Sequence, residues 1–279
     1  MKLLSPATIR RCFIADPGHL ILSADFDQIE LRVAAALSGE TVLIEAARRG
    51  ESLHKIAAVS LFGPDYTPDQ YRYTKNVNFG WLFGGGPLKL SEQAGIPLAQ
   101  STMIVNKYQR EFRHLTAYKK RTQTMALKAA LGRDYGRYCS IRERMWHYDK
   151  RDGEGRAHYT VMQSALNKML RGRVGIITTP TGRELQVDAD RAYAATNYVV
   201  QSTARDIMAA AMLRVMGDDE LEPTVLLPIH DELLGQAPKH IAEHIAQRYG
   251  EVMSTSLMDC PITATGKVYG RSWGHGYGA

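Results

Sequence analysis

The chain has 279 residues, of which 44% are hydrophobic and 23% are charged, which is the composition of an ordinary globular protein with one large core or two subdomains. No run approaches the roughly 18 apolar residues of a membrane span and no secretory signal opens the chain, so we expect a cytosolic protein. The net charge of +6 and the pI near 9.2 favour a polyanionic partner.

The first predicted strand covers residues 19–25. This short apolar run ends in a carboxylate and therefore delivers Asp25 to the exposed end of a buried strand. A helix is predicted directly after it, because Ile29, Val33 and Leu37 recur at helical spacing. Glu30 then lies near the start of that helix.

The clearest helix is predicted over residues 67–84, with a capping-box start at Thr67 and a Gly-Gly-Gly-Pro stop. Four side chains at spacings of three, four and four residues share one face of it: Arg72, Lys75, Phe79 and Phe83. A face that is cationic at one end and aromatic at the other can hold a triphosphate and stack on a base. The alternative is that the phenylalanines pack in a core and the basic residues point to water.

Residues 98–131 are predicted to be helical and basic. Between 101 and 121, six basic residues stand against one acid: Lys107, Arg110, Arg113, Lys119, Lys120 and Arg121. Residues 128–156 interleave basic side chains with aromatic ones, Trp146 among them, and an irregular insertion is predicted over 132–158. This mixture suits phosphate contacts and base stacking, with a solvated helix face as the alternative.

The rest of the chain predicts a hairpin over 174–187, a helix over 190–216, and two strands over 225–229 and 232–235 around the turn His230-Asp231. If the last strand pairs with the first, Asp25 and Asp231 lie side by side. Two such carboxylates form a cradle for Mg²⁺ ions that promote displacement at phosphorus. The alternative is that each aspartate merely ends a strand.

Four motifs together resemble those of the family A DNA polymerases, the bacterial and phage polymerase I type. Residues 25–32 read DFDQIELR, where the family usually has DYSQIELR in motif A. Residues 75–84, KNVNFGWLFG, resemble the nucleotide-binding helix KxxNFGxxYG of motif B, and residues 230–232, HDE, resemble motif C. Residues 197–206, NYVVQSTARD, are similar to the helix NxxxQGTAAD. The resemblance runs from about residue 8 to 273 and is weakest over 130–160.

The resemblance implies an α/β fold, in which an antiparallel-sheet polymerase palm at residues 1–50 and 161–279 carries an inserted, mostly helical fingers subdomain at 51–160. The implied enzyme is a DNA-directed DNA polymerase, which adds deoxynucleoside triphosphates to a primer 3′-hydroxyl and releases pyrophosphate. Primer–template DNA and dNTPs are the implied partners, with no membrane. The implied location is the cytoplasm of a bacterium or of a phage-infected cell.

The resemblance also implies a metal site. Asp25 and Asp231 would bind two Mg²⁺ ions, which Mn²⁺ can replace. The backbone carbonyl of Phe26 would complete one coordination sphere. Glu232 would be an auxiliary carboxylate nearby, so the implied catalytic set is Asp25, Asp231, Glu232 and Lys75.

The implied nucleotide site centres on Lys75, which would contact the triphosphate and protonate the pyrophosphate leaving group, with Arg72 as a second phosphate contact. Glu30 would exclude a 2′-hydroxyl below the sugar. The other implied nucleotide or primer contacts are Phe79, Phe83, Gln28 and His230. The implied DNA contacts are Gln201 and Asn197, which would read minor-groove acceptors, with Arg32, Lys107 and Arg110.

Four positions depart from the family pattern. An arginine usually stands four residues before the motif B lysine, but here Tyr71 holds that position and Arg72 stands three before, about 100° away around a helix. Phe83 replaces a tyrosine, which predicts looser sugar selection. Asp27 replaces a serine and adds negative charge close to the metals, and Ser202 replaces a glycine.

Motif A begins 25 residues from the first residue, which leaves no room for a thumb or a 3′–5′ exonuclease domain. We therefore expect a fragment or one half of a split polymerase, weakly active without a separate N-terminal piece that carries the thumb. Two alternatives remain. One is the palm of a phage-type single-subunit RNA polymerase, which Glu30 and Glu232 argue against, and the other is a non-catalytic DNA-binding subunit of a polymerase. A two-metal nuclease would not explain the nucleotide-binding helix.

Overall fold

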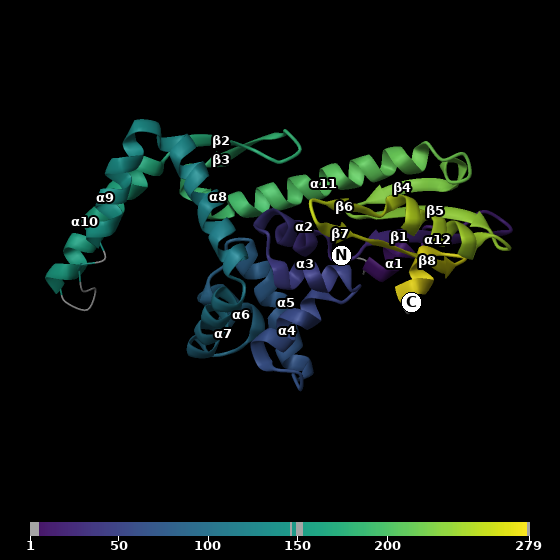
Figure 1. Cartoon of the computed structure of the whole chain (residues 1–279), viewed down its shortest axis with the longest axis horizontal. Coiled ribbons are helices and arrows are strands. Elements are labelled where there is room, and N and C mark those ends of the chain that lie inside the picture. The colour runs from purple at the N-terminus through teal and green to yellow at the C-terminus, as the bar shows by residue number, and fades with distance from the viewer. Residues whose placement is uncertain (1–5, 146, 149–152, 278–279) are drawn as a thin grey trace. The chain divides into compact units, whose positions relative to one another are not determined.

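The first predicted apolar run forms strand β1 (His19–Phe26) in the computed structural model, which describes residues 6–145, 147–148 and 153–277. β1 pairs antiparallel with β5 (Glu232–Pro238) on one side and with β8 (Ala264–Gly270) on the other. Strand β4 (Val225–Ile229) pairs with the outer edge of β5, so the sheet order is β4-β5-β1-β8 (Figure 1). The predicted antiparallel sheet and its three predicted strands, β1, β4 and β5, are therefore confirmed, and β8 adds a strand that the sequence pattern did not predict.

The chain folds into two units, the first formed by Met1–Ile56 with Thr203–Ala279 and the second by Ala57–Ser202. The first unit contains the sheet. Its other elements are α1 (Pro6–Arg10), α2 (Ile29–Ser38), α3 (Thr41–Arg48), η3 (Glu222–Thr224), α12 (Ala242–Met253), β6 (Thr255–Leu257), β7 (Cys260–Ile262) and η4 (Trp273–Tyr277).

Helix α12 covers one face of the sheet (Figure 1). Gly266 on β8 lets it approach closely, because a Cβ at this position would overlap the Ala246 carbonyl oxygen. Leu22 of β1 points to this face with its cross-strand partner Gly235, whose Cβ would meet the Tyr249 hydroxyl. The opposite face carries the other alternate positions of β1, which end in Asp25.

The second unit is mostly helical. Its elements are α5 (Pro68–Leu82), α6 (Pro87–Ala94), α7 (Leu98–Glu111), α8 (Arg113–Leu131), η1 (Gly132–Asp134), α9 (Tyr135–Met145), α10 (Gly153–Leu170), η2 (Ala189–Ala194) and the hairpin of β2 (Val174–Thr178) and β3 (Glu184–Asp188). Helices α4 (Leu53–Phe62) and α11 (Ala195–Met216) run from one unit into the other. The hairpin is confirmed, and the helix predicted from residue 190 begins as the 3₁₀ turns of η2.

The prediction of an irregular insertion over 132–158 is wrong. Among the described residues of this region, α9 and the start of α10 are regular helices, and the two helices lie against each other (Figure 1). Tyr138, Ile141 and Met145 recur at helical spacing and are buried, as is Leu166 of α10. The glycines suggested breaks, but Gly153 begins α10 and Gly155 is buried inside it. Trp146 lies outside the described residues.

No helix in the described part of the chain combines the length and the apolar character needed to cross a bilayer.

Candidate active site

The two aspartates singled out in the sequence lie at neighbouring strand ends. Asp25, near the end of β1, pairs across the sheet with Glu232, the first residue of β5. The backbone N–H of Phe26 donates to the carbonyl oxygen of Asp231 at 3.2 Å. The predicted pairing of these strands is confirmed, and it brings Asp25 and Asp231 to one edge of the sheet.

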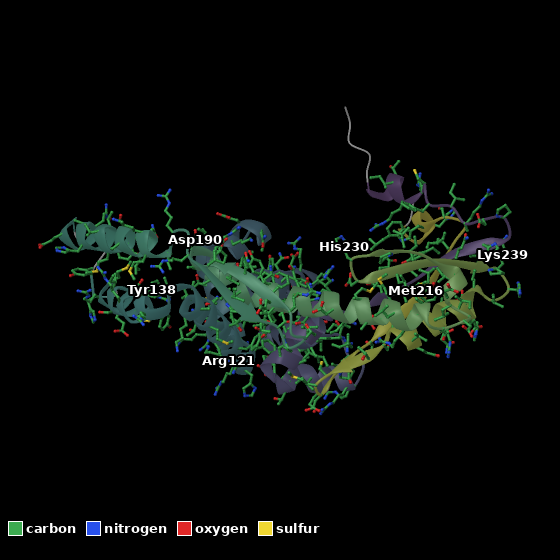
Figure 2. The ribbon with its side chains drawn as sticks, turned by 90° about the horizontal axis from the view of Figure 1, so that it is seen from above. Arg121, Tyr138, Asp190, Met216, His230 and Lys239 are labelled. Carbon is green, nitrogen blue, oxygen red and sulfur yellow. The ribbon has the colours of Figure 1, made fainter. Side chains whose placement is uncertain are left out.

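A two-residue turn sets the position of Asp231. His230 and Asp231 connect β4 to β5, since Ile229 pairs with Glu232. His230 has a φ of 56°, the left-handed conformation that two-residue hairpin turns require. Figure 2 shows His230 at this end of β5 and Lys239 beyond the other end. The exposed imidazole therefore lies directly beside the acidic edge.

Negative charge is crowded at this edge. Burial, followed by the charges of Asp231 and Glu232, raises the pKa of Asp25 to about 6, and the Lys267 ammonium acts in the opposite direction. Burial also raises the pKa of Asp231. Both carboxylates therefore ionise less readily than free ones, and a nearby cation would relieve the repulsion.

The donor atoms fit a hard divalent cation, since Asp25 and Asp231 offer carboxylate oxygens and Phe26 a backbone carbonyl. Among the residues that the structure describes, no three His, Cys, Asp or Glu side chains converge closely enough to hold a metal ion. Mg²⁺ usually takes only one or two protein carboxylates, and substrate phosphates and water complete its coordination.

Asp27, the residue that departs from motif A, is held by the neighbouring strand. Its carboxylate accepts hydrogen bonds from Thr263 Oγ1 at 2.9 Å and from Thr265 Oγ1 at 2.9 and 3.1 Å. Of the charges that raise the pKa of Asp25, that of Asp27 has the smallest effect. The sequence showed the extra acid but not the two threonines that bind it.

Gln28 and Arg32 make internal contacts in the first unit. The Gln28 side chain donates to Ser52 Oγ at 3.4 Å and accepts from the backbone N–H of His54 at 3.2 Å. Arg32 is 3% exposed and donates to the carbonyl oxygens of Asp27 and Pro261 at 2.6 and 2.8 Å. These positions give no support to the predicted nucleotide contact of Gln28 or DNA contact of Arg32. Glu30 lies half-buried in the first turn of α2, as predicted.

Helix α5 of the second unit carries the predicted motif B stripe. The capping box is confirmed, with Thr67 Oγ1 accepting from the Gln70 N–H at 3.2 Å and Gln70 Oε1 accepting from the Thr67 N–H at 2.8 Å. The buried face of the helix consists of other residues: Thr74, Val77, Asn78, Trp81 and Leu82.

The stripe itself lies on the face that is not buried. Arg72 and Lys75 are exposed, whereas Phe79 and Phe83 are half-buried with ring centroids 5.9 Å apart. Arg72 forms an ion pair with Asp69 at 3.0 Å, and Lys75 Nζ lies 4.9 Å from the Tyr71 ring centroid. The cationic and aromatic parts of the stripe are thus both accessible at one surface.

Two lysines of the basic segment have internal partners instead of pointing to solvent. Lys107 Nζ donates to the Leu61 carbonyl at 2.6 Å. Lys119 is buried and donates to the Trp81 carbonyl near the end of α5, with its ammonium 4.1 Å from the Trp81 ring centroid, and burial lowers its pKa to about 8. Lys119 thus neutralises the C-terminal dipole of α5, a role that the sequence pattern did not reveal. Arg110 is exposed.

Asn197 and Gln201 lie one turn apart on α11 and therefore share a face. Gln201 is exposed and Asn197 is half-buried. The buried Oδ1 atom of Asn197 has no hydrogen-bond partner among the described residues. Both positions remain predicted DNA contacts.

Comparison with known proteins places this arrangement in a family. The family model of DNA polymerase family A matches residues 4–275. The chain is 33% identical over 274 residues to the DNA polymerase of Mycobacterium phage D29, covering 98% of this chain and 38% of that protein. It is 32% identical over 249 residues to the thermostable DNA polymerase I of Thermus aquaticus, covering 88% of this chain and 26% of that protein.

A solved structure shares the fold. It is the polymerase domain of Pol1 from M. smegmatis in complex with DNA primer-template and dNTP, which matches with a TM-score of 0.71 at 23% identity over 99% of this chain and 44% of that chain. The present chain thus spans less than half of each of these proteins. With four motifs in order, paired strands that carry the acidic edge, and a family match over residues 4–275, the chain belongs to DNA polymerase family A.

Proposed function

We propose that this chain performs template-directed DNA synthesis, joining a deoxynucleotide to a primer 3′-hydroxyl with release of pyrophosphate. The observation that carries the proposal is the position of Asp25 and Asp231 at adjacent antiparallel strand ends. Family membership supports it, as does the primer–template and dNTP complex of the M. smegmatis relative.

Asp25 and Asp231, with the Phe26 carbonyl, would hold two Mg²⁺ ions, and Mn²⁺ would substitute. When bound, the ions supply charge stabilisation for the attacking and leaving oxygens. The protein contributes rigidity, because the carboxylates extend from hydrogen-bonded strands and the His230-Asp231 turn. His230 is assigned to the primer terminus.

In the second unit, we assign the exposed stripe of α5 to the nucleotide. Lys75 contacts the triphosphate and donates a proton to the pyrophosphate, and Arg72, once released from its exposed pair with Asp69, provides a second phosphate contact. Phe79 and Phe83 pack against the sugar and base. Glu30 of the first unit discriminates against a 2′-hydroxyl.

We further assign the first unit to the palm and the second to the fingers, with Gln201, Asn197 and Arg110 on the DNA. The sequence motifs placed the palm at 1–50 and 161–279, whereas the compact first unit consists of Met1–Ile56 and Thr203–Ala279. Because the D29 relative is matched over only 38% of its length, we propose that efficient synthesis requires additional polypeptide, such as a thumb that grips the duplex.

Asp231→Ala tests the enzyme against a DNA-binding subunit. In primer extension with Mg²⁺, the substitution is expected to abolish extension and to leave primer–template affinity within about twofold, since the DNA is held mainly by basic groups elsewhere. Asp219→Ala, which changes an exposed acid of the same unit, is the matched control and is expected to retain wild-type extension. Extension by Asp231→Ala at the wild-type rate would refute the assignment.

Two further arms separate the remaining alternatives. Parallel reactions with deoxynucleotides and ribonucleotides distinguish a DNA polymerase from an RNA polymerase. Reactions with and without a polypeptide that supplies the thumb test the need for additional grip. Robust processive synthesis by this chain alone would contradict that part of the proposal.

A further inference from the structure

The hydroxyl of Tyr269 links β8 to the acid-bearing face of the sheet. It donates to Glu232 Oε1 at 3.1 Å and accepts from Ser23 Oγ at 3.1 Å. The Tyr269 ring packs against the apolar cluster that contains Ile21, Leu234 and Trp273, so its position is restrained. Because Glu232 is only 9% exposed, this charge-assisted hydrogen bond strongly determines where its carboxylate lies.

The contact directs the Glu232 carboxylate toward the middle of β1. The Tyr269 hydroxyl that binds this carboxylate is also bonded to Ser23. Ser23 stands two residues before Asp25, which is about 7 Å away along an extended strand. Glu232 thus stands beside the aspartate pair without joining it.

We propose that Tyr269 is a positioning residue that keeps Glu232 out of the cation site of Asp25 and Asp231. This inference rests on the proposed function. The site then presents two carboxylates, and coordination positions stay open for water and for the phosphate oxygens of a nucleotide. A released Glu232 would add a third carboxylate, tighten cation binding and occupy a position that the nucleotide requires.

Mn²⁺ binding to the purified chain, measured by titration calorimetry, tests the inference without any synthesis. Tyr269→Phe is expected to tighten Mn²⁺ binding by up to about thirtyfold, the effect of bringing one unit negative charge close to a divalent cation in water. Ser23→Ala, which removes only the donor to Tyr269, is expected to shift the affinity in the same direction by less.

Tyr249→Phe is the matched control. Tyr249 is also buried in the first unit and bonds the Thr224 hydroxyl at 2.9 Å, but it belongs to α12 on the opposite face of the sheet. Its loss removes a buried tyrosine hydroxyl without touching Glu232, so the Mn²⁺ affinity is expected to stay at the wild-type value. If Tyr249→Phe and Tyr269→Phe changed the Mn²⁺ affinity to a similar extent, the cause would be a general loss of packing in the first unit, and the proposal would be overturned.

A double-mutant cycle with Glu232→Gln shows whether Tyr269 acts through Glu232. In the Glu232→Gln background, Tyr269→Phe is expected to change neither Mn²⁺ affinity nor primer extension. Equal tightening in both backgrounds, or weaker Mn²⁺ binding in Tyr269→Phe alone, would overturn the proposal. The second result would mean that Glu232 is already a ligand.

The carboxyl ¹³C resonance of Glu232, assigned by its loss in Glu232→Gln, provides a readout independent of metal and activity. It is expected to move in Tyr269→Phe and to stay unchanged in Tyr249→Phe. If the Glu232 resonance did not move in Tyr269→Phe, the proposed contact would be absent in solution, irrespective of the enzymatic activity. If the resonance and Mn²⁺ results hold but the wild-type chain extends no primer even with a polypeptide that supplies the thumb, the proposed function fails and the positioning role stands.

Discussion

Asp25 illustrates how one residue combines folding and function. It ends the apolar run of β1, and strand pairing brings it close enough to Asp231 and Glu232 for their charges to raise its pKa. Burial and this repulsion keep its pKa near 6, well above the ordinary value of 3.8. The folded chain without a cation therefore carries electrostatic strain at the position where the proposed chemistry needs a divalent ion.

Asp25→Asn is expected to stabilise the chain at neutral pH. Because the folded pKa exceeds the unfolded value, ionisation opposes folding; this cost is absent below pH 3.8, develops as the pH rises toward about 6, and is complete above. Asp25 is partly enclosed at the end of β1 but still exposed to solvent, so screening limits the gain to about 1 kcal/mol.

Thermal unfolding of both proteins in chelator at pH 8 and pH 3.5 checks this prediction. The unfolding temperature of Asp25→Asn should exceed that of the wild type at pH 8 and match it at pH 3.5. Added Mg²⁺ should raise the wild-type value more than the mutant value. A mutant that is less stable than the wild type at pH 8 would show that Asp25 is not strained.

Phe83 is a second residue whose identity has a testable consequence. The family motif usually has a tyrosine here, and Phe83 at the C-cap of α5 lacks its hydroxyl. Phe83→Tyr is expected to lower ribonucleotide incorporation relative to deoxynucleotide incorporation by roughly threefold to tenfold, the value of one hydrogen bond. The ratio of kcat/KM for the two nucleotides is the measurement, with Phe62→Tyr on α4 as a control outside the motif, and an unchanged ratio would count against the prediction.

At the scale of elements, local signals decide where helix α5 begins and distant contacts hold its other end. The capping box satisfies the first N–H groups, whereas Lys119 of α8 binds the Trp81 carbonyl near the C-terminus. Gly84, with a φ of 95°, follows directly, and a Cβ there would lie 2.5 Å from the Tyr193 ring. The stripe of Arg72, Lys75 and Phe79 is thus carried on a helix fixed at both ends.

Thr67→Ala is expected to destabilise the second unit by about 1 kcal/mol, because the Gln70 N–H loses its acceptor, Thr67 Oγ1, and only the bond from the backbone N–H of residue 67 to Gln70 Oε1 remains. Thr67→Ser keeps the hydroxyl and should behave as the wild type. Hydrogen exchange at the first turns of α5 measures the change locally. Equal protection of this turn in the alanine and serine variants would show that the cap contributes nothing.

At the scale of the whole molecule, the charge is divided unequally. The second unit contains 22 Lys/Arg against 12 Asp/Glu, so the remaining 13 basic and 17 acidic residues give the first unit a net negative charge. The basic character of the chain therefore resides entirely in Ala57–Ser202. This division suits the proposed function, in which the second unit contacts polyanions and the first binds cations.

Arg110→Ala is expected to reduce the salt dependence of DNA binding. Each lost phosphate contact lowers the slope of log affinity against log salt concentration by about 0.9. Arg49→Ala removes an exposed arginine of the first unit that pairs with Glu51 and should leave the slope unchanged. Fluorescence anisotropy with primer–template at several salt concentrations gives both slopes, and equal slopes for the two variants would exclude Arg110 as a phosphate contact.

Sequence periodicity was sufficient for much of the framework. The apolar run before Asp25, the strands around His230-Asp231, the hairpin and the α5 cap all rest on interactions within a few residues, and all are confirmed. The region 132–158 was misread because its glycines are strong local breakers, whereas burial of Tyr138 and Leu166 between α9 and α10 depends on packing between two helices.

By itself, the sequence determined the family, the strand that ends at Asp25 and the cationic and aromatic stripe of α5, because each depends on residue order along one segment. The tertiary structure alone decided which polar groups meet. It turned Arg32 and Lys119 inward toward backbone carbonyls, bound Asp27 to Thr263, and set Tyr269 against Glu232. The partners Pro261, Trp81, Thr263 and Glu232 lie 37 to 236 residues away along the chain, and a hydrogen bond between such groups depends on how strands and helices pack, which no local pattern encodes.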